Sequence, residues 1–358
     1  MDLFKPLIAK AATGASLTEA EARAAFDLIF AGSVTEAQLG GLLMALRARG
    51  ETVAEITGAA AALRARMLRV AAPPGAIDIV GTGGDGHQTR NISTLAALIT
   101  AACGVPVAKH GNRAASSKSG ASDVLGALGV GLELTPLEIE ACIREAGIGF
   151  MPAHAHHAAA RHAAPVRAEL GTRTIFNLIG PLANPAGVKF LVVGVFARAW
   201  LEPLAKVLRN LGCKRVWLLH GSDGLDEATT TGPTYVAALE GGCIRSFEIA
   251  PEDAGISRAS LKDLAGGEPA ENAAALLGVL EGARNAYRDI AILNAAVALI
   301  VAGRADDLKH GADMAAAALD EGLAAAKLAK LVQISNRASL PPEGVAIEAA
   351  KGIRCPTF

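Results

Sequence analysis

One stretch of the chain, residues 78–94, combines residue types that could hold a phosphate group. The stretch starts within a short apolar run, residues 77–80, which suits a buried strand. Four glycines then leave the backbone free to curl around an anion: Gly81, Gly83, Gly84 and Gly86. Three polar residues offer capping oxygens and N–H groups before the helical pattern of residues 95–102: Asn91, Ser93 and Thr94. Because a helix N-terminus favours negative charge, this stretch predicts a phosphate cradle, the alternative being a glycine-rich surface loop.

A second candidate anion site, residues 109–123, again follows an apolar run and precedes a helical pattern. Lys109 and Arg113 carry positive charge, and Gly111 allows the backbone to approach a ligand closely. Three serines add hydroxyl donors: Ser116, Ser117 and Ser119. These groups together could neutralise a polyphosphate, and the alternative is a solvated basic turn.

Two adjacent carboxylates, Asp226 and Glu227, lie in a glycine-containing segment after the apolar run of residues 216–220. Acidic residues on loops are usually only solvated. Loops at the carboxyl ends of parallel strands, however, are where open α/β sheets bind their ligands, so this pair could meet both cradles. Carboxylates beside a polyphosphate commonly hold magnesium.

The elements that must position these residues follow from the pattern along the chain. Residues 1–72 are helical by pattern, and three capping boxes predict helix starts there: Thr18 with Glu21, Thr35 with Gln38, and Thr52 with Glu55. Residues 73–75, Pro-Pro-Gly, then end the helical region. Beyond them, strands alternate with helices, and five strands are predicted at residues 77–80, 105–109, 190–196, 216–220 and 235–240.

This alternation predicts an α/β protein: a small all-helical domain plus a larger α/β domain with a mainly parallel central sheet. Residues 165–186 are helical again but interrupted by proline and glycine, so we expect them to cross back to the helical domain. The predicted domains are residues 1–72 with 165–186, and residues 73–164 with 187–336. Residues 337–358 are predicted to form an irregular tail.

Charge and composition narrow the classes of partner. The net charge of −1 gives no electrostatic basis for binding nucleic acid or an anionic membrane. The five cysteines are odd in number and scattered without a C-x-x-C pair, which disfavours disulfides and structural zinc. No signal peptide or membrane-spanning run is evident, so we expect a cytoplasmic protein.

All three elements together, in this order and spacing, resemble the anthranilate phosphoribosyltransferase family over residues 1–335. The resemblance includes three further segments: residues 165–177, 180–185 and 287–294. It implies the nucleoside phosphorylase/phosphoribosyltransferase-like fold and a homodimer. It also implies an enzyme of tryptophan biosynthesis that uses magnesium, as two ions. That enzyme transfers phosphoribose from 5-phosphoribosyl 1-pyrophosphate (PRPP) to anthranilate, giving N-(5-phosphoribosyl)anthranilate and pyrophosphate.

The resemblance also assigns residues by position. The PRPP site comprises Gly81, Gly84, Asp85, Thr89, Asn91, Ile92, Ser93, Thr94, Lys109, His110, Gly111, Asn112, Arg113, Ala114, Ala115, Ser116, Ser117 and Ala121. The magnesium ligands are Ser93, Asp226 and Glu227. The anthranilate contacts are Gly81, Asn112 and Arg167. No residue is assigned as a dedicated acid or base.

Arg167 suits the acceptor because a planar guanidinium can grip a carboxylate through two parallel hydrogen bonds. Its alternative role is a structural pair with Glu169 or another acid. The chain departs from the family pattern at residues 150–163, where Pro152 and His154 replace an aromatic residue and a proline. The departures bear on acceptor affinity and selectivity. Four histidines of this region suggest a helix face or tunnel wall rather than a metal site: His154, His156, His157 and His162.

Two rival functions stay open. A pyrimidine nucleoside phosphorylase shares the fold and much of the pattern around Lys109, but the Asp226–Glu227 pair and residues 91–94 favour PRPP. A catalytically silent relative that binds nucleic acid should carry a basic groove and should lack the cradle or the acid pair.

Overall fold

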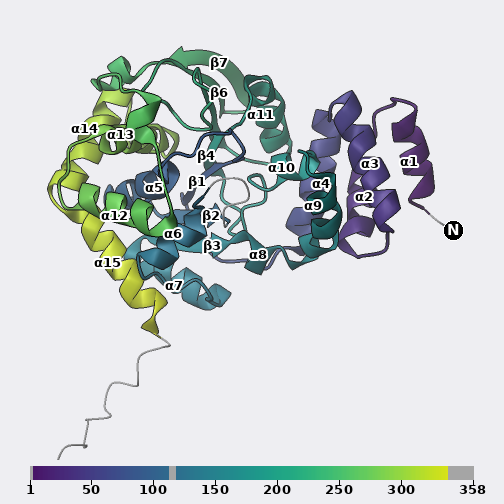
Figure 1. Ribbon diagram of the computed structural model, residues 1–358, viewed down its shortest axis with the longest axis horizontal. Coiled ribbons are helices and arrows are strands. Elements are labelled where there is room, and N and C mark those ends of the chain that lie inside the picture. Colours follow the sequence, from purple (N-terminus) through teal and green to yellow (C-terminus); the bar gives the residue numbers. More distant parts are fainter. Residues whose placement is uncertain (1–2, 113–117, 338–358) are drawn as a thin grey trace, which may run out of the picture.

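The computed structural model describes residues 3–112 and 118–337 of the chain. Four helices form a bundle at one end of the molecule (Figure 1). They are α1 (Lys5–Ala12), α2 (Glu19–Phe30), α3 (Glu36–Arg49) and α4 (Val53–Arg66). This bundle and the larger α/β part confirm the predicted fold class.

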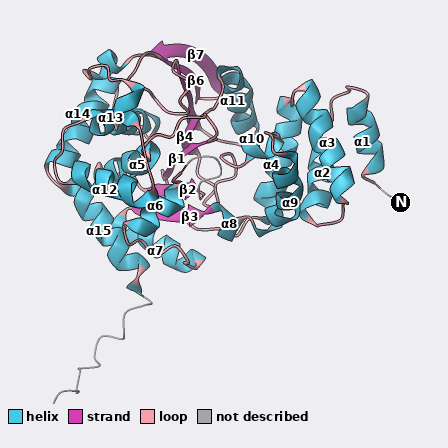
Figure 2. Ribbon diagram, in the orientation of Figure 1, coloured by secondary structure: helices cyan, strands magenta, loops and turns pink. Residues whose placement is uncertain are grey.

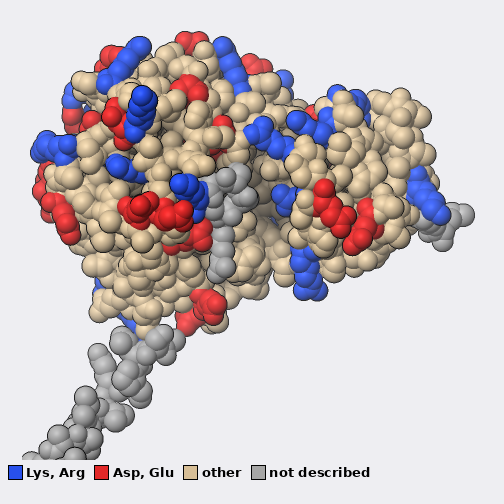
Figure 3. Space-filling model, in the orientation of Figure 1, with Lys and Arg blue, Asp and Glu red and all other residues tan. Residues whose placement is uncertain are grey.

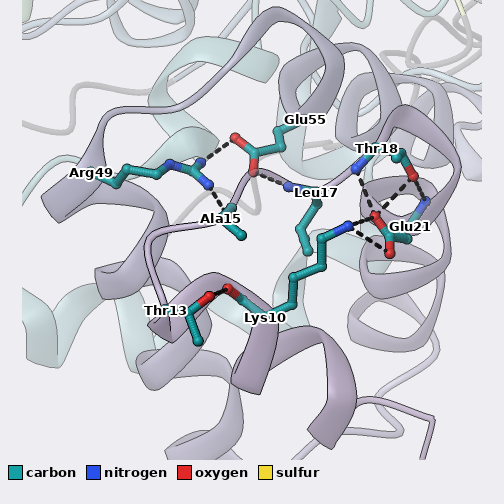
Figure 4. A network of polar contacts seen from close by, with 8 residues as sticks. All are labelled: Lys10, Thr13, Ala15, Leu17, Thr18, Glu21, Arg49 and Glu55. Carbon is teal, nitrogen blue, oxygen red and sulfur yellow. Dashed lines mark hydrogen bonds and ion pairs between the residues drawn. The ribbon is translucent and has the colours of Figure 1, made fainter.

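Polar contacts at the helix starts hold the bundle together. All three predicted capping boxes are confirmed, at Thr18, Thr35 and Thr52. Figure 4 shows that the box glutamates do more than cap. Glu21 pairs with Lys10 at 2.7 Å, and Glu55 pairs with Arg49 while accepting a hydrogen bond from the Leu17 N–H. These contacts tie the loop between α1 and α2 to the ends of α3 and α4.

Seven strands form one sheet in the order β3-β2-β1-β4-β5-β6-β7 (Figure 2). Their bounds are β1 Ile77–Gly81, β2 Val107–Gly111, β3 Ile148–Pro152, β4 Phe190–Gly194, β5 Arg215–Gly221, β6 Thr234–Glu240 and β7 Cys243–Ile249. The strands from β3 to β5 are parallel, and β6 and β7 pair antiparallel. The sheet is therefore mainly parallel, as predicted.

The five predicted strands are present, but their bounds and number needed correction. The strand predicted at residues 105–109 begins at Val107, because Pro106 has no N–H to donate to the sheet. The strand predicted to reach Phe196 ends at Gly194. Strands β3 and β7 were not predicted at all. A glycine and a terminal proline obscure the pattern of β3, and β7 is an edge strand whose side chains are mostly exposed.

Eleven further α-helices surround the sheet among the described residues. They are α5 Ile92–Ala102, α6 Ala121–Ala127, α7 Pro136–Ala146, α8 Ala153–His156, α9 Ala164–Leu170, α10 Ile175–Ile179, α11 Leu201–Asn210, α12 Pro269–Leu280, α13 Ala286–Val301, α14 Leu308–Asp320 and α15 Leu323–Ser335. Short 3₁₀ helices lie at Ala158–Ala163, Arg198–Trp200, Pro251–Ala254 and Leu261–Leu264. In the part of the chain described, no helix is long and apolar enough to span a bilayer.

Side-chain alternation divides the sheet between two cores. Ile79 and Val192 face the core built with α5 and α13, whereas Val80 and Val193 face the core shared with α4 and α11. The second core continues into the helical bundle, where α9 and α10 pack against α3. This packing agrees with a chain that returns to the bundle after residue 164. The domain boundaries themselves stay a prediction.

Candidate active site

The carboxyl ends of β1, β2, β4 and β5 lie along one edge of the sheet. The loops that follow β1, β2 and β5 carry the predicted site residues. Two strand-ending glycines let the loop with Asp226 cross this edge. A Cβ on Gly194 would lie 1.6 Å from the Asp226 carbonyl oxygen, and one on Gly81 would lie 2.4 Å from its Oδ2. Because neither distance is possible for real atoms, a side chain at Gly194 would displace the backbone of the loop that carries Asp226, and one at Gly81 would displace the Asp226 carboxylate. Glycine is required here by close approach.

The loop after β1, residues 82–91, leaves backbone N–H groups available to a ligand. Gly83, Gly84 and Gly86 have φ of +63°, +72° and +84°, which other residues rarely adopt. The Gly83 N–H donates to Asp226 Oδ2 at 2.7 Å. No described residue accepts a hydrogen bond from the N–H of Gly84, Asp85 or Gly86. Successive N–H groups of this kind can form an anion-binding concavity, and the phosphate cradle stays a prediction.

The start of α5 differs in detail from its prediction. Asn91 is the N-cap, but its side chain makes no capping bond, so that prediction is wrong. The Asn91 amide instead donates to the Ser119 carbonyl and accepts from Asn272. Tyr287 donates its hydroxyl to the Asn91 carbonyl at 3.0 Å. The tertiary contacts satisfy the Asn91 side chain and fix the cradle against α12 and α13.

Lys109 lies beneath the cradle rather than on its surface. It is 2% exposed, and its Nζ donates to the Ile79 carbonyl at 2.6 Å and to Ser93 Oγ at 3.3 Å. Burial lowers the pKa of Lys109, while the charges of Asp78 and Glu227 oppose that shift. The structure thus brings three predicted site residues together: Lys109, which is buried, and Ser93 and Glu227, which are partly exposed.

Asp226 and Glu227 are carboxylates without a full set of donors. Burial, followed by the charge of Asp85, raises the pKa of Asp226 to about 7. Burial and the charge of Asp226 raise the pKa of Glu227 to about 8, against the lowering effect of Lys109. Such like-charged groups lose their protons readily only when a cation neutralises them.

These oxygen donors fit magnesium, which prefers carboxylate, hydroxyl and water oxygens. The fit is a partial shell, because no three His, Cys, Asp or Glu side chains within residues 3–112 and 118–337 form a complete metal site. An ion there takes its other ligands from water and substrate, as magnesium does in phosphate sites.

The second predicted wall is only partly described. Arg113, Ala114, Ala115, Ser116 and Ser117 lie outside the described residues. Of the rest, Gly111 ends β2 beside Ala121, and its missing side chain makes room for Phe150, since a Cβ would lie 2.8 Å from that ring. The Asn112 carbonyl accepts from Ser122 at 3.2 Å, at the start of α6.

Arg167, on α9, has no carboxylate partner among the described residues, so the alternative pairing with Glu169 is not found there. Its guanidinium instead lies 5.0 Å from the centroid of the Phe176 ring. Burial lowers the pKa of Arg167. A half-buried guanidinium without an acid is suited to an incoming carboxylate.

The segment that departs from the family pattern ends β3 at Pro152 and continues into α8. His154 is exposed, His156 contacts the Leu68 carbonyl at 2.7 Å, and His157 packs against His110 with ring centroids 5.1 Å apart. Burial lowers the pKa of His157 to about 4. The histidines therefore serve different contacts, and His157 packs on β2 through His110.

Sequence reasoning missed two residues that hold the loops in place. Arg173 donates to the Gly84 carbonyl, and His87 Nε2 contacts the Asp223 carbonyl at 3.1 Å. Both lie inside segments singled out by their motifs, but the partners are 89 and 136 residues away in the chain, so no local pattern could have paired them.

Comparisons with known proteins agree with this fold. Residues 73–325 match the model of the glycosyl transferase family a/b domain, and residues 5–67 match its helical bundle domain. The fold and site therefore define a glycosyl transferase with a helical bundle and an α/β domain.

Individual relatives narrow the class. The anthranilate phosphoribosyltransferase of Methylocella silvestris is 71% identical over 95% of this chain and 98% of its own, and that of Beijerinckia indica is 68% identical over 94% and 98%. The anthranilate phosphoribosyltransferase structure from Thermus thermophilus superposes with a TM-score of 0.88 at 43% identity, covering 94% of this chain and all of that one. The Saccharomyces cerevisiae enzyme in complex with PRPP and Mg has a TM-score of 0.86 at 27% identity, covering 94% and 98%. The chain belongs to the anthranilate phosphoribosyltransferase family.

Proposed function

We propose that the reaction of this family takes place at one edge of the sheet. There the loop after β1, residues 82–91 (the glycine loop), meets the loop after β5 that carries Asp226 and Glu227 (the acid loop). In that reaction the phosphoribosyl group of PRPP is transferred to the amine of anthranilate, giving N-(5-phosphoribosyl)anthranilate and pyrophosphate. One observation carries the assignment. The free N–H groups of residues 84–86 adjoin a pair of carboxylates with raised pKa values, and a Gly83–Asp226 hydrogen bond joins the two loops. An anion site beside a cation site suits a magnesium pyrophosphate.

The glycine loop and the start of α5 hold the phosphates of PRPP in this proposal. Thr94 supports it, because its hydroxyl is buried at 1% exposure and has no partner among the described residues. The remaining contacts follow the family positions: Gly81, Gly84, Asp85, Thr89, Asn91, Ile92, Ser93, Lys109, His110, Gly111, Asn112 and Ala121, with residues 113–117. Lys109 acts from below, through Ser93 and the local charge.

Ser93, Asp226 and Glu227 hold magnesium, as two ions. The raised pKa values of Asp226 and Glu227 support this assignment. So does the fact that all three side chains offer only oxygen ligands, which magnesium prefers. Magnesium, when bound, supplies positive charge to the pyrophosphate oxygens. The Saccharomyces cerevisiae relative, whose structure contains PRPP and Mg, agrees with that pairing.

Arg167, Asn112 and Gly81 bind anthranilate, with Arg167 on its carboxylate. The Saccharomyces cerevisiae enzyme in complex with 4-fluoroanthranilate shows that a related chain binds an acceptor analogue. In this chain the Arg167 guanidinium lies over the Phe176 ring, and we infer that this contact restricts the orientation of the guanidinium plane. A fixed plane favours the two parallel hydrogen bonds of a carboxylate.

The mechanism rests on positioning and charge. The loop N–H groups bind the leaving pyrophosphate, the C1′–oxygen bond breaks as the ribose gains oxocarbenium character, and the amine of anthranilate forms the new C1′–nitrogen bond from the opposite face. No strong base is required, because an aromatic amine is neutral at pH 7 and its proton can leave after the bond has formed.

The deciding experiment follows the fluorescence of anthranilate in the presence of PRPP and magnesium. The control assays activity on thymidine plus phosphate. We expect the anthranilate signal to fall only when PRPP and magnesium are both present. Activity on the nucleoside alone would reassign the protein to the pyrimidine nucleoside phosphorylases.

Arg167→Ala tests the acceptor assignment. Loss of a charged hydrogen-bond pair should raise the KM for anthranilate by about tenfold to a hundredfold while the KM for PRPP changes little. Arg161→Ala, at an exposed arginine of the preceding 3₁₀ helix, is the matched control. An unchanged anthranilate KM in Arg167→Ala would refute the assignment.

We further propose a cytoplasmic homodimer that serves tryptophan biosynthesis. The homodimer is what the family resemblance implies. Restored growth of a tryptophan auxotroph that lacks this step tests the role in tryptophan biosynthesis. The mass of the protein in solution tests the homodimer.

Figure 3 shows that basic and acidic side chains are interspersed on the face that it draws. That face therefore offers no continuous basic stripe for nucleic acid.

A further inference from the structure

Arg173 lies in the short connection between α9 and α10 and reaches across to the glycine loop. Its Nη2 donates to the Gly84 carbonyl, and its guanidinium carbon lies 4.3 Å from the centroid of the Phe196 ring. A Cβ on Gly84 would lie 3.5 Å from Arg173 Nε, so the guanidinium packs directly on this residue. The side chain is held between the loop and an aromatic ring.

Phe196 fixes a second point of the same loop. Its backbone N–H donates to Thr82 Oγ1 at 3.0 Å, and the Thr82 N–H donates to the Gly194 carbonyl at 2.9 Å. Phe196 therefore holds the loop at Thr82, and Arg173 holds it at Gly84. These two points lie on either side of Gly83, whose N–H donates to Asp226. The loop owes its position to these tertiary contacts, since no regular ladder continues beyond Gly81.

The geometry of the peptide bond gives this contact a consequence. In a planar trans peptide the carbonyl of one residue and the N–H of the next point in opposite directions. When Arg173 holds the Gly84 carbonyl, the Asp85 N–H must point away from Arg173. That N–H has no acceptor among the described residues. Arg173 thus sets the direction of a donor that is left free for a ligand.

We propose that Arg173 is a positioning residue for the phosphate donor: it turns the Gly84–Asp85 peptide so that the Asp85 N–H binds a phosphate oxygen of PRPP. This inference rests on the proposed function and extends it to a residue outside the predicted site. Arg173 itself touches the loop and not the substrate. Arg167 lies six residues earlier in the same segment, so one short stretch of chain supports both the donor and the acceptor sites.

The test measures PRPP binding directly, by calorimetry with magnesium and without anthranilate, together with both KM values. Arg173→Ala should weaken PRPP binding by about tenfold or more, the effect of one charged hydrogen bond, and leave the KM for anthranilate within about twofold. Arg173→Lys can still donate to the Gly84 carbonyl but cannot stack a planar group on Phe196. Its PRPP affinity should therefore lie between those of the unchanged protein and Arg173→Ala. Phe196→Leu should resemble Arg173→Lys.

Arg198→Ala is the matched control. Arg198 also stacks on an aromatic ring, Tyr235, at 3.6 Å and also follows β4, but it contacts no residue of the glycine loop. It should bind PRPP like the unchanged protein.

The inference is overturned if Arg173→Ala binds PRPP within about twofold of the unchanged protein. It is also overturned if Arg173→Ala weakens the binding of PRPP and of anthranilate equally while its melting temperature falls. That pattern is expected of a residue that only stabilises the fold. If Arg173→Ala does not fold, Arg173→Lys and Phe196→Leu decide by the same criteria. Binding of PRPP without any transfer to anthranilate would refute the proposed function and leave the role of Arg173 to be judged on affinity alone.

Discussion

Two carboxylate sites, one buried in the bundle and one partly exposed at the sheet edge, show how differently these regions treat the same chemical group. In the bundle, Glu55 is fully buried, and burial alone would raise its pKa. Hydrogen bonds from Arg49, Leu17 and Thr52 outweigh that effect, so the pKa of Glu55 lies below its usual value. At the sheet edge, burial and mutual repulsion prevail, and the pKa values of Asp226 and Glu227 rise to about 7 and about 8.

The difference lies in the donors around each group. Glu55 receives hydrogen bonds from a guanidinium, two backbone N–H groups and a hydroxyl. Asp226 receives one from Gly83 and lies near Asp85, a like charge. A carboxylate whose donors come from its own chain stabilises the fold, whereas one that lacks them gains its partner from a ligand. The same division applies to backbone N–H groups, which are capped at the helix starts and free in the glycine loop.

Replacing the acid pair should have the largest effect on activity and little effect on stability. In the Asp226→Asn, Glu227→Gln double variant we expect a higher magnesium requirement and a kcat/KM about a thousandfold lower, equivalent to about 4 kcal/mol. Its melting temperature without magnesium should equal or exceed that of the unchanged protein, because two repelling charges are removed. Wild-type magnesium dependence in this variant would show that the two acids are ordinary solvated residues.

Glu55→Gln should show the opposite pattern. Removing the charge leaves Arg49 without its partner and breaks a buried network, so the free energy of unfolding should fall by about 3 kcal/mol. Chemical denaturation measures this loss. The KM values of the folded variant should stay within about twofold of the unchanged protein, and a selective loss of activity would contradict the contrast between the two regions.

The pH dependence of magnesium binding sharpens the comparison. Because the pKa values of Asp226 and Glu227 are raised, protons compete with magnesium below about pH 8, and the apparent magnesium affinity should fall by about tenfold or more between pH 8.5 and 6.5. In the absence of metal, the same shift makes the folded state bind more protons than the unfolded state. Stability should therefore decrease, relative to the neutral double variant, as pH rises from about 5 to 8.

Titration calorimetry at several pH values and thermal melts without magnesium check the two statements. Glu55→Gln should follow the pH course of the unchanged protein between pH 6.5 and 8.5, since the pKa of Glu55 is lowered out of that range. A magnesium affinity independent of pH would mean that the acid pair is already ionised without the metal.

Much of the fold was predictable because its signals are local. The capping boxes at Thr18, Thr35 and Thr52 each span four residues, and all three form. Strand β7 was missed because an edge strand exposes most of its side chains. The capping role of Asn91 was wrong because Ser119 and Asn272, distant in the chain, compete for its amide. At Asn91, therefore, tertiary contacts override a local preference.

By itself, the sequence determined the order of helices and strands, the glycines that can curve around an anion, and the acid pair that follows a buried strand. These depend on neighbouring residues and on periodicity. The tertiary structure alone decided that Lys109 lies under Ser93, that Arg167 lies over the Phe176 ring, and that Arg173 holds Gly84. Such contacts join residues from different elements, and their burial and charge exist only after the sheet has brought its loops to one edge.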